Sequence, residues 1–156
     1  MSVGKMLKGH DLFASLSVEE MNQISNLASS KTYAADETIF KYNGAGSHVY
    51  MLMSGSVYLR LPANAPDFSF VISKIEMGEL FGLSPLLDSP RYTSTAQCTE
   101  ECEVLAIEAK PFRELLRNNH LVGFNIMNQV AHIYFSRYIA VLKNVQSILN
   151  QIPLIR

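Results

Sequence analysis

The sequence is poor in cysteine and carries almost no net charge. Its two cysteines, Cys98 and Cys102, are too few among 156 residues for a disulfide-stabilised secreted scaffold. The 13 Lys and Arg residues nearly balance the 14 Asp and Glu residues, so the chain offers no strongly basic surface to nucleic acid or to an anionic membrane. We therefore expect a protein of a reducing compartment, the cytoplasm, that contacts neither nucleic acid nor membrane.

Targeting signals and long apolar runs are missing as well. The chain begins Met-Ser-Val-Gly-Lys, without the apolar segment of a signal peptide, and we expect Met1 to be the natural start. No stretch approaches the roughly 18 consecutive apolar residues of a membrane-spanning helix. Hydrophobic residues nevertheless make up 48% of the chain, which excludes a disordered chain and predicts a single domain, with or without a long appended element.

Residue groupings typical of enzymes are also absent. The four histidines are isolated, with no His-x-His pair and no His-Glu-x-x-His, and they are His10, His48, His120 and His132. A catalytic zinc site needs several such ligands to converge, and the spacing of histidines and cysteines does not favour a haem ligand. Neither a phosphate-binding loop nor a nucleophile elbow is present. We expect no metal, no catalytic residues and no enzymatic activity.

The first organised element is a helix near the N-terminus. Ser17 followed by Glu20 fits a capping box, in which each side chain accepts a hydrogen bond from the other residue's backbone N–H. Met21, Ile24 and Leu27 then recur at helical spacing. This pattern predicts a helix over about 17–29.

Short strands dominate the middle of the chain. Segments rich in Tyr, Phe, Val, Ile and Thr alternate with turn residues, at 38–40, 48–54, 56–61, 68–73, 93–97 and 103–107. In the segment 56–61, Val57, Leu59 and Leu61 fall on one face. Many short strands without long crossover helices predict a mainly β fold, an antiparallel sandwich or barrel with flanking helices.

Helix returns at the C-terminus. Pro111 suits the first turn of one helix, and from about 121 to 151 only the early Gly123 disfavours a second, which would span roughly 45 Å. An apolar stripe follows its length and is interrupted at Arg137. Two interpretations stay open: a helix packed on its own β domain, or a helix projecting past that domain to pair with a second copy.

The segment from Gly78 to Ala96 interrupts the strand pattern. Ser84 and Pro85 resemble the cap and first position of a short helix, which begins just after a glycine. A helix start of this kind concentrates free N–H groups and favours an anion, and Arg91 lies just beyond it, where a phosphate would use it. The alternative is a plain connection between two strands.

Several of these motifs together resemble a known family. Ala35–Phe40, Tyr50–Val57, Gly78–Leu87 and Cys102–Ile107 have the order and spacing of the cyclic-nucleotide-binding domain of the catabolite-activator and protein-kinase-regulatory type, over about residues 10–150. The resemblance implies an eight-stranded antiparallel jelly roll with an N-terminal helix, a phosphate-binding cassette between two strands, and C-terminal helices. In the bacterial branch the last helix pairs two subunits.

The resemblance also implies a domain division and a ligand site. Residues 1–120 correspond to the β-roll with its N-terminal helix, and residues 121–156 to the dimerisation helix. The implied ligand-binding residues are Phe81, Gly82, Leu83, Ser84, Arg91, Tyr92 and Thr93. Only about five residues follow the long helix, so the DNA-binding domain of the bacterial branch is either missing or cut off.

Two positions of the cassette depart from the family pattern. Leu83 stands where the family has a Glu that binds the ribose 2′-hydroxyl, and a count without gaps places Tyr92 where the family has the Arg that binds the cyclic phosphate. Arg91 serves instead if the loop absorbs one residue, and Glu79 is an upstream substitute for the missing Glu. Losing a hydrogen bond to a charged group predicts roughly tenfold to hundredfold weaker binding of a cyclic nucleotide.

The sequence therefore predicts a non-catalytic, ligand-sensing regulatory module that forms a homodimer through residues 121–151. Its effector is cyclic AMP or cyclic GMP, bound weakly, or another small molecule, since some members of the family take haem or small organic acids. No other cofactor is indicated. The alternative is a dimeric interaction scaffold whose pocket is filled by its own side chains.

Overall fold

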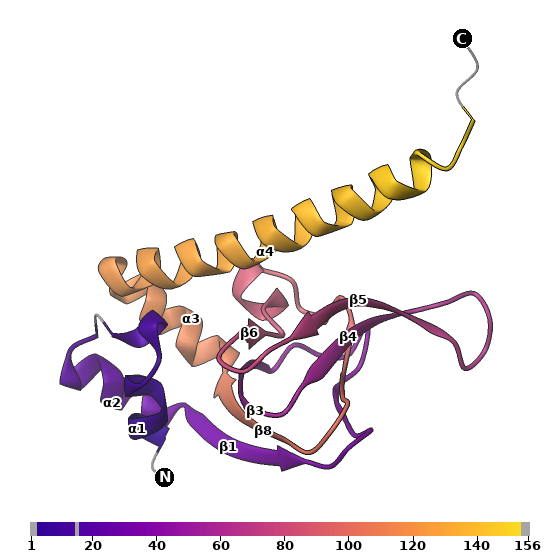
Figure 1. Ribbon diagram of the computed structural model, residues 1–156. Coiled ribbons are helices and arrows are strands. Elements are labelled where there is room, and N and C mark those ends of the chain that lie inside the picture. The colour runs from indigo at the N-terminus through magenta and orange to yellow at the C-terminus, as the bar shows by residue number, and fades with distance from the viewer. Residues whose placement is uncertain (1–2, 15, 154–156) are drawn as a thin grey trace.

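The chain folds into two four-stranded sheets flanked by helices, and the computed structural model describes residues 3–14 and 16–153 (Figure 1). One sheet has the order β1 (Ala28–Tyr33), β8 (Cys102–Glu108), β3 (His48–Ser54) and β6 (Leu80–Phe81). The other has the order β2 (Thr38–Phe40), β7 (Thr95–Cys98), β4 (Val57–Pro62) and β5 (Ser69–Ile75). All pairings are antiparallel, which confirms the predicted eight-stranded jelly roll.

The central strands β3 and β8 are buried on both faces, because side chains alternate between faces along a strand. Tyr50 and Leu52 point into the roll, where they join an aromatic and aliphatic cluster. Their neighbours Val49 and Met51 join a second cluster between this sheet and the helices. The sheet therefore separates two cores, one inside the roll and one beneath the helices.

The N-terminal segment contains α1 (Val3–Lys8), the 3₁₀ turn η1 (Asp11–Phe13) and α2 (Val18–Asn26). The predicted capping box is present, since Ser17 Oγ accepts from the Glu20 N–H at 3.2 Å and Glu20 Oε2 accepts from the Ser17 N–H at 2.8 Å. The predicted extension to residue 29 is wrong. The Leu27 carbonyl instead accepts from the Glu108 N–H at 2.9 Å, which starts the β1–β8 pairing.

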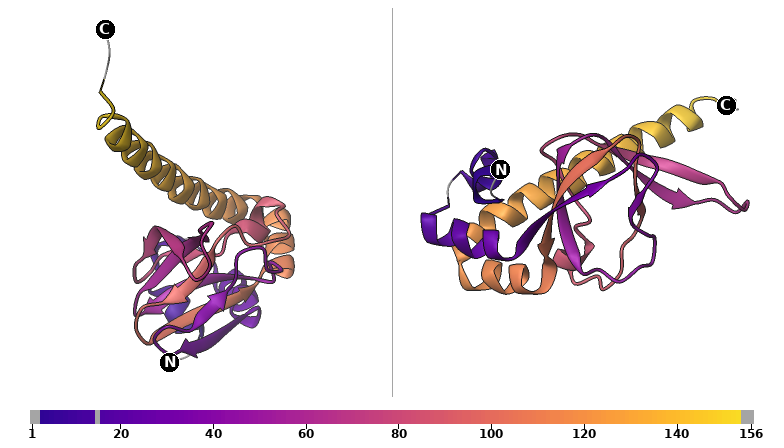
Figure 2. Two further views of the ribbon diagram at one scale, coloured as in Figure 1. Left: turned by 90° about the vertical axis from the view of Figure 1, so that its right-hand side faces the viewer. Right: turned by 90° about the horizontal axis from the view of Figure 1, so that it is seen from below.

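The hairpin of β4 and β5 extends away from the roll (Figures 1 and 2). The predicted strand over 68–73 is present as β5, but its large apolar side chains Phe68, Phe70 and Ile72 are exposed. β5 is an edge strand of its sheet, so neither of its faces is covered where the hairpin leaves the roll.

Two helices complete the chain, α3 (Ala109–Asn118) and α4 (His120–Leu149). The first half of α4 packs on the domain through the buried Val122, Ile126 and Val130. Residues 141–150 are all exposed, and this half projects past the sheets (Figures 1 and 2). The first half thus packs as the first interpretation predicts, and the second half projects as the second interpretation requires, while its pairing with a second copy stays a prediction.

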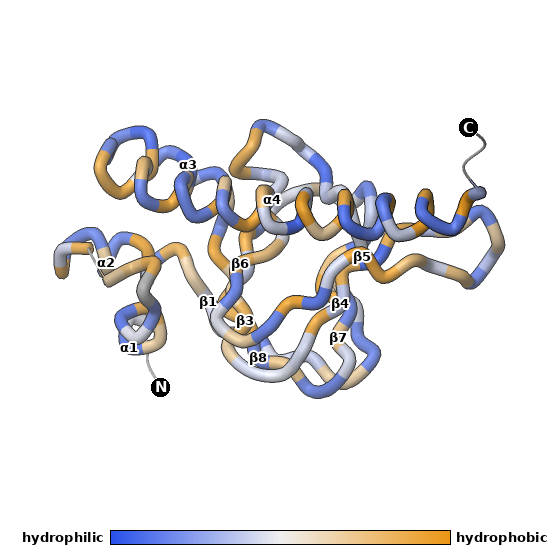
Figure 3. Tube along the Cα trace, turned by 45° about the horizontal axis from the view of Figure 1, so that its top comes forward, coloured by the Kyte–Doolittle hydropathy of each residue, from blue (hydrophilic) through white to orange (hydrophobic). Residues whose placement is uncertain are grey.

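Hydrophobic residues continue along the projecting half of α4 (Figure 3). Within the described residues, no helix is long and apolar enough to cross a membrane.

Candidate functional site

The cassette is a loop followed by the 3₁₀ turn η2 (Ser84–Leu87). Gly82 has φ +65°, and a Cβ there would lie 2.9 Å from the Phe40 ring and 3.0 Å from the Tyr50 ring. Only glycine adopts this conformation freely and lets the loop lie so close to the aromatic core. Leu83 is the N-cap residue and forms no side-chain cap, so the prediction of Ser84 as the cap is wrong by one position.

A cavity of about 290 Å³ lies between the cassette, the β4–β5 sheet and α4. The cassette and the segment that leads into β7 contribute Gly82, Leu83, Ser84, Tyr92, Thr93 and Ser94 to its lining. Five of the seven predicted site residues therefore lie together here. Phe81 and Arg91 do not line the cavity.

Phe81 is fully buried beside the cavity and stacks on Tyr50, with 5.4 Å between ring centroids. Arg91 is exposed, and its guanidinium Nη1 donates to the Asn43 carbonyl at 2.7 Å. The one-residue difference between Arg91 and Tyr92 thus turns one side chain out of the roll and the other into it.

Tyr92 is buried and fills part of the interior of the roll. Its ring lies against Phe40, and its hydroxyl donates to the His48 carbonyl at 2.7 Å and accepts from the His48 N–H at 3.1 Å. Nearby, burial raises the pKa of Tyr50, and the interaction with Tyr92 raises it further. The inner wall of the cavity therefore carries the aromatic rings of Phe40 and Tyr92.

The outer wall comes from α4, which contributes Tyr134, Arg137, Tyr138 and Val141. Arg137 is half-buried, and its Nη2 donates to the Leu80 carbonyl at 3.4 Å. Burial lowers the pKa of this guanidinium, an effect that Tyr134 and Glu79 oppose. Burial likewise raises the pKa of Tyr134, while Arg137 and Ser84 oppose that shift.

Sequence reasoning missed these α4 residues as part of the site. The available signal was Arg137 itself, a charged residue at an inward position of an otherwise apolar stripe. Its neighbours on that stripe, Ile126 and Val130, are buried, and Ile133 packs on the same core.

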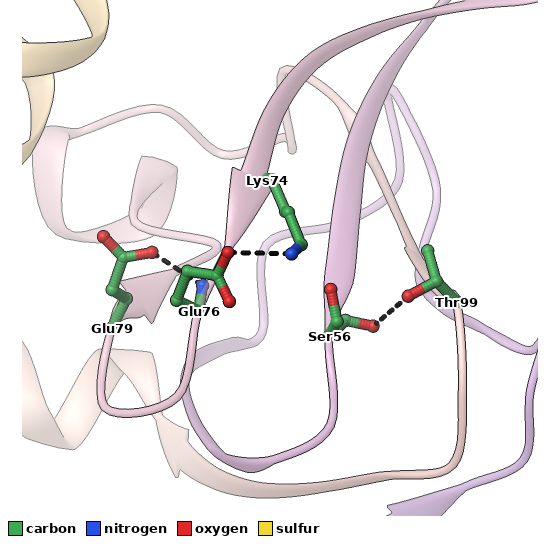
Figure 4. A network of polar contacts seen from close by, with 5 residues as sticks. All are labelled: Ser56, Lys74, Glu76, Glu79 and Thr99. Carbon is green, nitrogen blue, oxygen red and sulfur yellow. Dashed lines mark hydrogen bonds and ion pairs between the residues drawn. The ribbon is translucent and has the colours of Figure 1, made fainter.

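Glu79 does not take the place of the missing family Glu. Its Oε2 accepts from the Glu76 N–H at 2.8 Å, and Glu76 in turn forms an ion pair with Lys74 at 2.9 Å (Figure 4). Glu79 does not line the cavity. Its carboxylate instead stabilises the turn that leads into β6.

The cassette is also tied to the C-terminal helices. Arg113 of α3 forms an ion pair with Asp88, the residue that ends η2, and its Nη1 lies 3.4 Å from the Pro85 carbonyl. A shift of η2 would therefore act directly on α3, which precedes α4.

The cavity lining contains no His, Cys, Asp or Glu, and across residues 3–14 and 16–153 no three such side chains gather in a way that would hold a metal ion. Cys98 and Cys102 are free thiols, buried away from the cavity. The arrangement suits reversible binding of a small molecule, through rings, hydroxyl groups and one guanidinium.

Comparison with known proteins agrees with this architecture. The sequence model of the cyclic nucleotide-binding domain matches residues 30–119, more than half of the chain. The chain belongs to the cyclic nucleotide-binding domain family. Membership supports a regulatory, ligand-binding role.

Relatives in the family come from several bacteria. The chain is 28% identical over 120 residues to the cyclic AMP receptor protein of Thermus thermophilus. The matched region covers 77% of this chain and 55% of that protein. It therefore spans little more than half the length of this relative. A solved structure of a candidate cyclic nucleotide-binding protein from Geobacter metallireducens is 28% identical with a TM-score of 0.75, covering 88% of this chain and 99% of that one. The solved structure of the catabolite activator protein of Thermus thermophilus is 26% identical with a TM-score of 0.68, and the match covers 87% of this chain and 62% of that one.

Proposed function

We propose that this protein is a non-catalytic, effector-sensing regulatory module of the cytoplasm, and that its effector binds in the cavity between the cassette and α4. One observation carries the proposal: the cavity has walls from both elements. A molecule that touches both favours the orientation of α4 that offers it better contacts, and such differential affinity is what shifts a conformational equilibrium.

The size and the lining of the cavity fit this role. Its volume of about 290 Å³ is near the lower end of the range for small-molecule sites, roughly 300–1,000 Å³. We assign effector contacts to Gly82, Leu83, Ser84, Tyr92 and Thr93. Phe81 supports the cassette from the core, and Arg91 has no part in this assignment because it points to solvent.

Cyclic AMP and cyclic GMP are the first candidates by family, and their binding is expected to be weak. Leu83 offers no acceptor to a ribose hydroxyl, and Tyr92 offers no positive charge to a cyclic phosphate. The scaffold alternative rests on the Tyr92 ring, which packs on Phe40 inside the roll. The space left beside that ring favours a ligand.

A second copy of the chain is the partner we propose for α4. Tyr138, Leu142, Val145 and Leu149 of α4 are exposed and recur at alternating steps of four and three. This is the heptad spacing by which two helices interlock side chains along a common seam. The division into a β-roll over 1–120 and a dimer helix over 121–156, pairing through 121–151, stays part of this proposal.

Thermal unfolding with added compounds tests the proposed site. The compounds are cyclic AMP, cyclic GMP and cinnamate, the last a flat aromatic carboxylate. Val141→Trp adds bulk to the cavity, whereas Ser147→Trp, further along the same exposed half of the helix, lies outside both the cavity lining and the heptad seam. At a hundredfold excess over Kd a ligand adds about 2.7 kcal/mol of stability, or roughly 5–10 °C in Tm for a chain of this size.

At least one compound should raise the Tm of the wild type and of Ser147→Trp but not that of Val141→Trp. No rise with any compound, or an equal rise in the Val141→Trp variant, would contradict binding in this cavity.

A further inference from the structure

Arg137 is the only charged side chain among the described residues that line the cavity. It lies on the inward stripe of α4, and the packing of Val130 and Ile133 on the domain's core fixes the rotation of the helix. The guanidinium is therefore held toward the cavity by the docking of the whole helix.

No acidic side chain forms an ion pair with this guanidinium within the described chain. The ion pairs found there join Lys74 to Glu76 and Arg113 to Asp88. The charge of Glu79 favours the charged form of Arg137 through space, while the Glu79 carboxylate accepts from the Glu76 N–H. A half-buried cation with no ion-pair partner is costly, and a bound anion in direct contact would lower that cost.

The guanidinium also has unused hydrogen-bond donors. It carries five N–H donors, and the one acceptor found for it among the described residues is the Leu80 carbonyl at 3.4 Å. A planar fork of this kind binds a carboxylate or a phosphate through two parallel hydrogen bonds.

The rest of the cavity suits a flat, mostly apolar body. Tyr92 and Phe40 line it from the roll, and Tyr134 and Tyr138 line it from α4. Aromatic rings on both sides of the cavity favour a ligand with an aromatic body. No carboxylate in the lining repels an anion or selects a basic molecule.

We propose that the effector is a small organic anion with a flat aromatic body, and that Arg137 of α4 binds its anionic group in place of a cassette arginine. This inference rests on the proposed function. The anionic group of the effector contacts α4, and its aromatic body contacts the roll. A bound effector therefore links the helix to the roll.

Isothermal titration with a matched pair of compounds tests the inference. Cinnamate carries the carboxylate, and cinnamamide has nearly the same shape without the charge. The proteins are the wild type, Arg137→Gln, Arg137→Lys, and Arg117→Gln as a charge-loss control on an exposed residue outside this cavity.

Cinnamate should bind the wild type and Arg117→Gln equally, and roughly tenfold to a hundredfold more weakly to Arg137→Gln. Arg137→Lys should retain part of the affinity because it keeps the charge but loses the fork. Cinnamamide should bind weakly, and to the same extent in all four proteins.

Three results would overturn the inference: no cinnamate binding at millimolar concentration, equal affinities of the wild type for the two compounds, or unchanged cinnamate binding in Arg137→Gln. Failure of the proposed function has a different signature. If cinnamate binding is blocked by Val141→Trp but unaffected by Arg137→Gln, the cavity is a binding site and only the anion inference fails. Equal binding of either compound to wild type and Val141→Trp would exclude the cavity itself.

Discussion

The ring of Tyr92 stacks on the ring of Phe40 with 4.0 Å between their centroids and 19° between their planes. The Tyr92 hydroxyl extends beyond this stack to bind both backbone polar groups of His48. A single side chain, at the position that the sequence count predicts for the family's phosphate-binding arginine, thus fixes the wall of the roll to the start of β3.

Replacing Tyr92 by Phe should destabilise the protein. The ring stack remains, but the His48 N–H and carbonyl lose their hydroxyl partner in a partly buried position. Leaving buried polar groups without partners costs about 1–3 kcal/mol, which urea denaturation measures directly. Tyr42→Phe, at a half-exposed tyrosine, is the matched control and should change stability by less than about 0.5 kcal/mol. Equal stability of the Tyr92→Phe and Tyr42→Phe proteins would show that these hydrogen bonds contribute nothing.

Restoring the family residues should strengthen binding of cyclic AMP. The double variant Leu83→Glu with Tyr92→Arg supplies an acceptor for the ribose and a cation for the phosphate. Each charge-assisted bond is expected to improve affinity roughly tenfold to a hundredfold, as measured by isothermal titration after circular dichroism has confirmed folding. Arg91→Gln should leave the affinity unchanged, because Arg91 points to solvent. A large loss in the Arg91→Gln protein would instead place the phosphate outside the roll.

Charges on the heptad seam should separate the proposed dimer. Leu142→Asp with Leu149→Asp puts two carboxylates of each chain into the seam, and light scattering should then report a monomer. Asn144→Asp with Ser147→Asp adds the same charge to the same helix off the seam and should leave a dimer. Ile133 is unsuitable for this test because it packs on the protein's own core. A monomeric wild type, or a dimer that survives the seam charges, contradicts pairing through α4.

Stability should fall as the pH drops below about 6.5, in part because of His48. Burial lowers the pKa of its ring, the charge on Lys31 lowers it further, and Glu108 opposes both. The unfolded chain therefore takes up a proton near the ordinary pKa of about 6.5 before the folded chain does. The stability gained above that pH is lost as the pH falls through the lower folded value. His48→Gln should reduce the loss of Tm between pH 7.5 and 5, and His132→Gln, at an exposed site on α4, should not. A His48 ring that titrates above 6.5 by NMR would reverse the sign.

Much of the roll was predictable because its strands alternate in burial. The segment that forms β4 has its apolar residues on one face. The strands β3 and β8, which are buried on both faces, are apolar over most of their length. β1 was not predicted, since Ser29, Ser30 and Lys31 give it no apolar face, and all three are exposed. Its place depends on pairing with β8, a contact between residues distant in the sequence. α1 is short and lacks a repeating pattern, so local signals did not reveal it.

The cassette was predictable and its opposite wall was not. Counting residues without gaps assigned Tyr92 to the position of the family's phosphate-binding arginine. The inward orientation of the Tyr92 side chain is consistent with that count, because a shift of one residue turns a side chain to the opposite face. Arg137 was visible only as a break in an apolar stripe. Its position over the cavity depends on how α4 docks on the roll, which the stripe of a single helix does not specify.

Chemical-shift mapping by NMR tests the central claim, that an effector binds between the cassette and α4. The backbone amides would be recorded before and after addition of cinnamate and, separately, of cyclic AMP. The predicted result is a cluster of cinnamate-induced shifts over 82–84, 92–94 and 134–141. Shifts confined to the exposed seam beyond residue 141, or no shifts with either compound, would contradict the account.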